Sequence, residues 1–95
     1  MSYEVIFHAG ALREFDKLPD AARKRLTRVI DDLAKEPRPQ GAVKLAGVDA
    51  YRIRVGDYRV AYAVRDERLV VLVVKVGHRR DLYKEIATIK QRLRQ

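Results

Sequence analysis

Residues 51–60 read Tyr-Arg-Ile-Arg-Val-Gly-Asp-Tyr-Arg-Val and carry the clearest structural pattern in the chain. Apolar and basic side chains alternate on both sides of a Gly-Asp pair, which is the pattern of two β-strands with one buried face. Gly56 can adopt the positive φ that the first central position of a two-residue hairpin turn requires. The stretch therefore predicts an antiparallel hairpin in which Arg54 lies opposite Arg59.

This register gathers arginines on one side of the hairpin. Because strand side chains alternate, Arg52, Arg54 and Arg59 all project to the face opposite the apolar residues. Like charges that face each other across a strand pair destabilise it, by up to ~1 kcal/mol. A guanidinium, however, presents planar, bidentate donors to phosphate. Ala61 and Ala63 lie on the same face and are expected to leave it recessed, so the sequence predicts a recessed phosphate site.

The charge of the whole chain supports this interpretation. The 95 residues hold 21 Lys and Arg against 13 Asp and Glu, a net charge of +8. Residues 1–36 carry seven acidic and seven basic side chains, so the entire excess lies in residues 37–95. Such an asymmetry favours a surface that faces a polyanion. Two alternatives remain open: a basic surface that only maintains solubility, and arginines that pair with acids such as Asp57 and Glu85.

The segment before the hairpin is predicted to be a strand followed by two helices. Residues 3–7 are β-branched and aromatic, as in a short strand. Apolar residues then recur at spacing three from Leu12 to Leu18, and Pro19 marks the start of a second helix. This second helix is predicted to end before Pro37. Its apolar stripe consists of Ala22, Leu26, Val29, Ile30 and Leu33.

The segment after the hairpin is predicted to add one strand and a final helix. A polar turn at residues 65–68 precedes an apolar run at residues 69–76, which is typical of a central strand covered on both sides. Gly77 ends this strand, and Asp81 is the expected N-cap of the helix. The apolar stripe of the helix consists of Leu82, Ile86, Ile89 and Leu93.

The predicted order is β-α-α-β-β-β-α, in a single domain over residues 1–95. It favours an α+β fold, in which an N-terminal helical hairpin and a C-terminal helix pack on one face of a mostly antiparallel, twisted sheet. The chain has no cysteine, which excludes disulfides and thiolate chemistry. Its longest apolar run is shorter than the ~20 residues that span a bilayer. No secretory pattern is visible at the N-terminus, so a cytoplasmic protein without membrane contact is expected.

More candidate site residues follow the last strand. His78, Arg79 and Arg80 lie between this strand and the final helix, and such connections often carry binding and catalytic residues. An imidazole titrates near neutral pH, which suits His78 to proton transfer, and Tyr83 can stack on a base. The alternatives are an exposed histidine without a role and a tyrosine that packs at the edge of the helix's apolar stripe.

The sequence contains no motif for a metal or a cofactor. It has no glycine-rich phosphate loop, no two histidines four residues apart and no cluster of carboxylates. The sequence therefore predicts no cofactor and no metal. If the chain is a nuclease, the chemistry open to it is attack by an RNA 2′-hydroxyl on the adjacent phosphate, with cations stabilising the charge that develops.

Four stretches carry a resemblance to a known family: Phe-Asp-Lys-Leu-Pro at 15–19, Lys-Leu-Ala-Gly at 44–47, the hairpin at 51–60 and Val-Gly-His-Arg-Arg-Asp-Leu-Tyr at 76–83. Together they resemble the RelE-type toxins of bacterial toxin–antitoxin systems, in the RelE/ParE superfamily. The resemblance implies a microbial-ribonuclease-like fold and an endoribonuclease that cleaves mRNA in the ribosomal A site. It also implies attack by the 2′-hydroxyl, which leaves a 2′,3′-cyclic phosphate and a 5′-hydroxyl.

The resemblance also implies roles for single residues. Arg59 and Arg79 would stabilise the charge of the transition state, with Arg54 in the same catalytic group. Tyr83 would stack on the nucleotide or orient it, and would assist proton transfer. The expected RNA-binding residues are Arg52, Lys44, Arg80 and Lys84.

One departure from the family concerns the general base. The best-known member has lysines where this chain has Arg52 and Arg54, and an arginine does not release its proton as a lysine with a lowered pKa can. The hypothesis that follows is that His78 acts as the base.

The resemblance also implies binding partners. Two other functions remain as alternatives. A RelB-like antitoxin, the ribosome and mRNA are the expected partners. The toxin–antitoxin complex is expected to be hetero-oligomeric and to bind DNA through the antitoxin. The alternatives are a ParE-like inhibitor of DNA gyrase without nuclease activity, and a nucleic-acid-binding module without catalysis.

Overall fold

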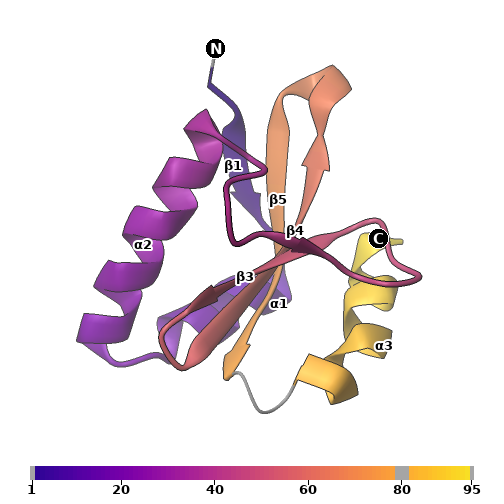
Figure 1. Ribbon diagram of the computed structural model, residues 1–95. Helices are drawn as coiled ribbons and strands as arrows, with labels where there is room; N and C mark the ends of the chain where they lie inside the picture. Colours follow the sequence, from indigo (N-terminus) through magenta and orange to yellow (C-terminus); the bar gives the residue numbers. More distant parts are fainter. Residues whose placement is uncertain (1, 79–81, 95) are drawn as a thin grey trace.

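The computed structural model describes residues 2–78 and 82–94, and only the backbone of residues 82–84. A twisted sheet runs through the middle of the molecule, with α2 on one side of it and α3 on the other (Figure 1). The elements are β1 (Glu4–Phe7), α1 (Ala9–Asp16), α2 (Asp20–Lys35), β2 (Val43–Lys44), β3 (Tyr51–Val55), β4 (Tyr58–Arg65), the 3₁₀ turn η1 (Asp66–Arg68), β5 (Val70–His78) and α3 (Leu82–Leu93).

The strands form one sheet in the order β1-β5-β4-β3-β2. β1 pairs with β5 in parallel, and the other neighbours pair antiparallel. The predicted α+β class and the mostly antiparallel sheet are therefore confirmed. The edge strand β2 was not predicted as a separate strand, because its two residues are too few for an alternating pattern to emerge.

The hairpin between β3 and β4 has the predicted register. Arg54 pairs with Arg59, and Arg52 pairs with Ala61. Gly56 in the turn has a φ of 60°, a backbone conformation that is readily accessible to glycine and strained for most other residues. The alternation in the strands and the short turn thus specify the same pairing.

A bulge in β5 changes which residues share a face. Ala61 pairs with Lys75 but Tyr62 pairs with Val73, so Val74 is an extra residue in β5. Val74 packs in the cluster that contains Ile89 of α3, and Lys75 also reaches α3. The bulge therefore brings two consecutive residues of β5 to the face that α3 covers.

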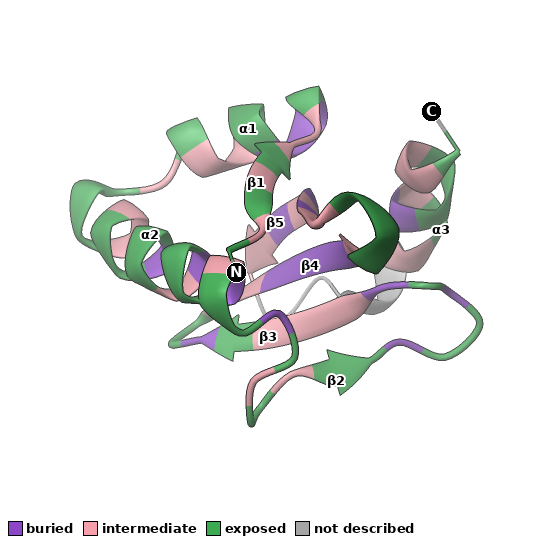
Figure 2. Ribbon diagram, turned by 90° about the horizontal axis from the view of Figure 1, so that it is seen from above, coloured by how far each residue is buried: buried purple, intermediate pink, exposed green. Residues whose placement is uncertain are grey.

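Helices cover both faces of the sheet, as Figure 2 shows. On one face, Leu26 of α2 packs in a cluster with Val60 of β4. On the other face, Ile89 of α3 packs with Ala61 and Val74. The expectation that all helices pack on one face is wrong. β5 carries apolar side chains on both of its faces, and burying both requires cover from both sides.

Tyr62 anchors the loop after α2 to the sheet. It is among the largest fully buried side chains, and its hydroxyl donates a hydrogen bond to the Pro37 carbonyl oxygen at 2.8 Å. Burial raises the pKa of Tyr62 to about 12. Because Tyr62→Phe leaves that carbonyl without this donor, we expect the free energy of unfolding to fall by about 1–2 kcal/mol. Urea unfolding measures this. Tyr58→Phe is the control, and an equal loss in both variants would contradict the prediction.

A second polar link joins the N-terminal segment, the loop after α2 and the β4–β5 turn. Tyr3 donates a hydrogen bond to Asp66 at 2.7 Å, and Arg38 donates to both oxygens of that carboxylate at 3.2 and 2.9 Å. The hydrogen bonds from Arg38 and then Tyr3 lower the pKa of Asp66 to about 2, from an ordinary value of 3.8. The folded protein therefore binds this proton more weakly than the unfolded chain does.

This link predicts an acid-dependent loss of stability. The contribution of Asp66 is complete at a pH above its ordinary pKa of 3.8 and is lost as the pH falls toward about 2. We expect the unfolding free energy of the wild type to fall more steeply across this range than that of Asp66→Asn. Urea unfolding at a series of pH values compares the two proteins, and curves of equal slope would rule the prediction out.

Candidate nucleic-acid interface

The three arginines of the hairpin occupy one side of β3 and β4, and we call Arg52, Arg54 and Arg59 the arginine surface. Arg54 and Arg59 face each other, and Arg52 pairs with Ala61, so all three project to the face that α3 partly covers. Arg54 is exposed, whereas Arg52 and Arg59 are half-buried. The predicted gathering of these residues on one face is therefore present.

Arg52 and Arg54 have their charge available for a ligand. Within residues 2–78 and 82–94, neither side chain makes a hydrogen bond or an ion pair with the protein. Other arginines of the chain do have such partners: Arg38 pairs with Asp66, and Arg65 lies 3.5 Å from Asp49. For Arg52 and Arg54, the alternative that they pair with acids of the same chain is thus not supported.

The two alanines next to the arginines do not leave a recess. Ala61 is 2% exposed and Ala63 is fully buried. Ala61 lies in the cluster with Ile89 of α3 and Leu45 of the β2–β3 connection. The expectation of a recessed surface is therefore wrong at this point, because the small side chains make room for α3 instead. The arginine surface lies beside α3 and is not a pit in the sheet.

Two predicted site residues lie on the opposite face of the sheet. His78 pairs with Tyr58, and their rings are 5.8 Å apart. Lys44 pairs with Tyr51. Both tyrosines pack against the cluster under α2, and paired residues of neighbouring strands project to the same side. The structure therefore does not bring His78 or Lys44 together with the arginine surface.

The remaining predicted residues follow His78. Arg79 and Arg80 lie outside the described residues, as does the expected N-cap Asp81. Tyr83 and Lys84 lie in the first turn of α3, and their side chains are outside what the structure describes. Their roles stay predictions.

A cluster of charged residues that the sequence did not reveal lies beside the arginine surface. We call it the α3 clamp, and its members are Glu14 of α1, Lys75 of β5, and Glu85 and Arg92 of α3. Arg92 donates to the two carboxylate oxygens of Glu14 at 2.9 and 3.1 Å, and Lys75 donates to Glu14 as well. Lys75 also lies 3.5 Å from Glu85. Lys75 was the available signal, because it is the one charged residue in an otherwise apolar run at residues 69–76.

The protonation of Glu14 follows from this environment. Burial by itself would raise the pKa of Glu14. Hydrogen bonds from Arg92, Lys75 and the Val76 amide outweigh burial and hold the pKa below its ordinary value. Glu14 is therefore ionised at neutral pH, and the clamp contains two negative and two positive side chains.

Other surface features carry less information. A hollow of about 450 Å³ lies along α2, on the face away from the arginine surface, and contains none of the predicted site residues. Among the described residues, no three His, Asp or Glu side chains gather as a metal ion would need. No described helix is both long and apolar enough to cross a membrane.

Comparison with known proteins gives the family. The model of the family described as "ParE toxin of type II toxin-antitoxin system, parDE" matches residues 5–83. The mRNA interferase toxin RelE of Escherichia coli K12 is 38% identical over 82 residues, which cover 83% of this chain and 85% of that protein. The chain belongs to the RelE family of type II toxins. The resemblance seen in the sequence is thereby confirmed.

Solved structures of RelE toxins have the same fold. A double mutant of E. coli RelE in the free state superposes with a TM-score of 0.80 at 31% identity, covering 98% of both chains. The archaeal RelE–RelB complex from Pyrococcus horikoshii gives a TM-score of 0.75 at 35% identity, covering 83% of this chain and 97% of the matched chain. The RelE of that structure was solved in complex with RelB.

Proposed function

We propose that this RelE-family toxin is an endoribonuclease that cleaves mRNA in the ribosomal A site without a metal ion of its own. The observation that carries the proposal is the pair of arginines Arg52 and Arg54, exposed or half-buried and without a partner in the described parts of the chain. A guanidinium that has no acidic partner in the protein can donate two parallel hydrogen bonds to a phosphate. The name of the E. coli relative, an mRNA interferase, supports the same class of reaction.

The reaction proposed is an internal transesterification. The 2′-oxygen attacks the adjacent phosphorus, the bond from phosphorus to the 5′-oxygen breaks, and the 2′-hydroxyl proton leaves while the 5′-oxygen gains one. The products are a 2′,3′-cyclic phosphate and a 5′-hydroxyl. Negative charge grows on the phosphoryl oxygens in the transition state, so fixed cations lower the barrier. We assign this role to Arg59 and Arg79, with Arg54 beside them, and nucleotide stacking to Tyr83.

The structure changes the expectation for His78. Its ring lies against Tyr58, on the face of the sheet away from the arginines. A general base must come within hydrogen-bond reach of the proton that it removes. We therefore expect His78→Gln to keep the cleavage rate within about twofold of the wild type and to leave the pH–rate profile unchanged. Single-turnover cleavage between pH 5.5 and 8.5 tests this, and a lost acidic limb would return the role of base to His78.

The proposal includes a protein partner. Structures of RelE toxins such as that of P. horikoshii were solved as complexes with RelB. A RelB-like antitoxin that covers the arginine surface of this chain would neutralise it. An acidic segment would complement the net charge of +8.

The other candidate function is inhibition of DNA gyrase. Its support is the description of the matching family model, which names the ParE toxin. The deciding experiment incubates the purified protein with programmed ribosomes, maps mRNA ends by primer extension, and runs a gyrase supercoiling assay in parallel. Cuts at the A-site codon support the endoribonuclease. Inhibition of gyrase without cuts would overturn it.

A further inference from the structure

The α3 clamp holds both ends of α3 through mostly covered charges, because Glu85 lies in its first turn and Arg92 in its last turn. The exposed fraction is 23% for Glu14, 15% for Lys75, 17% for Glu85 and 15% for Arg92. Arg92 also donates to the carbonyl oxygen of Val74 at 2.9 Å. When one member of such a group is removed, the remaining charge stays covered without its partner. Removal of any one of the four side chains is therefore expected to destabilise the clamp.

Two glycines allow the side chains of α3 to lie directly on backbone. A Cβ atom on Gly10 would stand 2.5 Å from Nη2 of Arg92, and a Cβ on Gly77 would stand 2.9 Å from Oε1 of Glu85. Real Cβ atoms do not approach other atoms so closely, so each glycine provides the space that a charged group of α3 occupies. The Arg92 side chain thus lies directly against the backbone of α1, and the Glu85 side chain lies directly against the last part of β5.

The position at which Glu85 contacts Gly77 lies next to the arginine surface. Gly77 pairs with Arg59 across β4 and β5, and paired positions project to the same face. The Gly77 position that meets Glu85 is therefore next to the base of the Arg59 side chain. Lys75, which lies 3.5 Å from Glu85, projects to the same face two residues earlier. The clamp thus continues the arginine surface toward α3.

We propose that the α3 clamp makes Glu85 a positioning residue for the arginine surface, a proposal that rests on the endoribonuclease function proposed above. Glu85 holds the first turn of α3, which carries Tyr83, at a set position relative to Arg59. Lys75 pairs with Glu85, and the pair of Glu14 and Arg92 holds the last turn of α3. Side chains that must meet one phosphate need such fixed spacing, because a misplacement of about 1 Å can reduce the rate ~100-fold.

The kinetic test perturbs the Glu85 carboxylate in two ways. Glu85→Gln removes its charge. Gly77→Ala pushes it away, and no backbone strain arises because Gly77 is not one of the glycines with positive φ. In ribosome-bound mRNA cleavage, we expect both variants to lower kcat about 10- to 100-fold while KM changes less than about threefold. Glu67→Gln is the matched control, since Glu67 is an exposed acid in η1. Loss of kcat no greater than in the control would overturn the proposal.

A second test asks whether the α3 clamp stabilises α3, and it does not depend on mRNA cleavage. Amide hydrogen exchange is followed in the wild type, Glu14→Gln and Lys75→Met. Faster exchange of the α3 amides in both variants, with the α2 amides unchanged, is the expected result. Unchanged protection of α3 would overturn the clamp. If the wild type cleaves no mRNA on ribosomes, the proposed function fails, and the exchange experiment still gives its own answer on the clamp.

Discussion

Arg54→Gln is expected to lower the rate of mRNA cleavage about 100-fold or more and, at the same time, to stabilise the fold slightly. The loss follows from the role of a fixed cation at a phosphoryl transition state, where one donor contributes roughly 10²–10³ in rate. The gain in stability follows from the register, because Arg54 faces Arg59 directly. Removing one of two opposed like charges is expected to add a few tenths of a kcal/mol.

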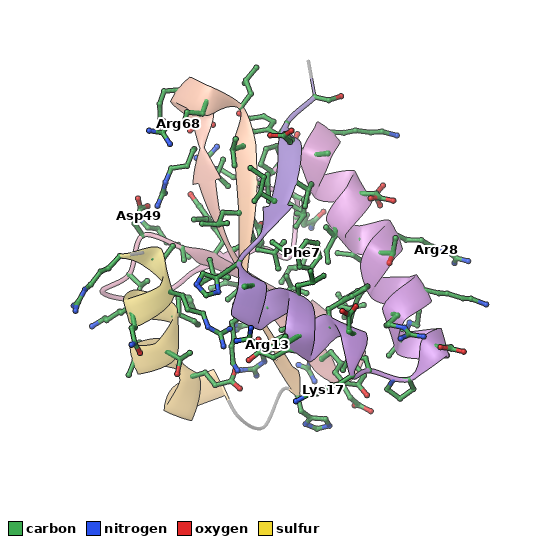
Figure 3. The ribbon with its side chains drawn as sticks, turned by 180° about the vertical axis from the view of Figure 1, so that it is seen from behind. Phe7, Arg13, Lys17, Arg28, Asp49 and Arg68 are labelled. Atoms are coloured by element: carbon green, nitrogen blue, oxygen red, sulfur yellow. The ribbon has the colours of Figure 1, made fainter. Side chains whose placement is uncertain are left out.

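The predicted changes in cleavage rate and in stability have opposite signs, which separates loss of a functional charge from damage to the fold. A substitution that acts by damaging the fold lowers both activity and stability, whereas removal of a ligand-binding charge lowers only activity. Single-turnover cleavage on ribosomes and urea unfolding measure the two quantities. Arg68→Gln is the control, because Arg68 is exposed in η1 (Figure 3), in the β4–β5 turn away from the Gly56 turn. Full activity of Arg54→Gln would remove Arg54 from the proposed site.

Arg59→Gln extends the same experiment. Arg59 is half-buried beside Gly77, so it is more tightly positioned than Arg54. We expect a loss of activity at least as large, about 10²–10³-fold. An activity loss for Arg59→Gln that is much smaller than for Arg54→Gln would place the scissile phosphate nearer β3 than β5.

Leu26→Ala is expected to produce the largest loss of stability. Leu26 is fully buried in α2, in the cluster that joins this helix to Val60 and Tyr62 of β4. Truncating a buried leucine removes apolar contact and leaves a cavity, which together lower the free energy of unfolding by about 2–5 kcal/mol. For a domain of this size, that is a large part of the total stability.

The matched control for this prediction is Leu12→Ala. Leu12 lies in the neighbouring helix α1 but is 45% exposed. The same atoms are removed from both sites, so the difference isolates burial. We expect Leu12→Ala to change the unfolding free energy by less than about 1 kcal/mol. Urea unfolding of the two variants gives the comparison, and similar losses at both positions would argue against the packing described for α2.

Much of the fold could be read from local patterns. The register of the hairpin follows from strict alternation and a two-residue turn, and Arg54 pairs with Arg59 as predicted. α2 follows from apolar spacing and ends before Pro37. These features depend on residues that are neighbours in the chain, so periodicity reports them directly.

It was harder to predict which face of the sheet each helix covers. A helical stripe such as Ile86 and Ile89 shows which side of α3 is buried, but it does not say which face of the sheet receives it. The apolar run in β5 did contain a hint, because a strand that is apolar on both faces needs cover on both. The bulge at Val74 adds a register shift that alternation alone cannot show.

Local patterns in the chain were enough to predict the helices, the hairpin register, the family resemblance and the gathering of Arg52, Arg54 and Arg59 on one face. The position of His78 on the other face, and the contacts of Glu14 with Lys75 and Arg92, became visible when the elements were packed together. Those partners are 61 and 78 residues apart in the chain. Contacts at such separations depend on how complete elements pack, and local periodicity carries no information about that packing.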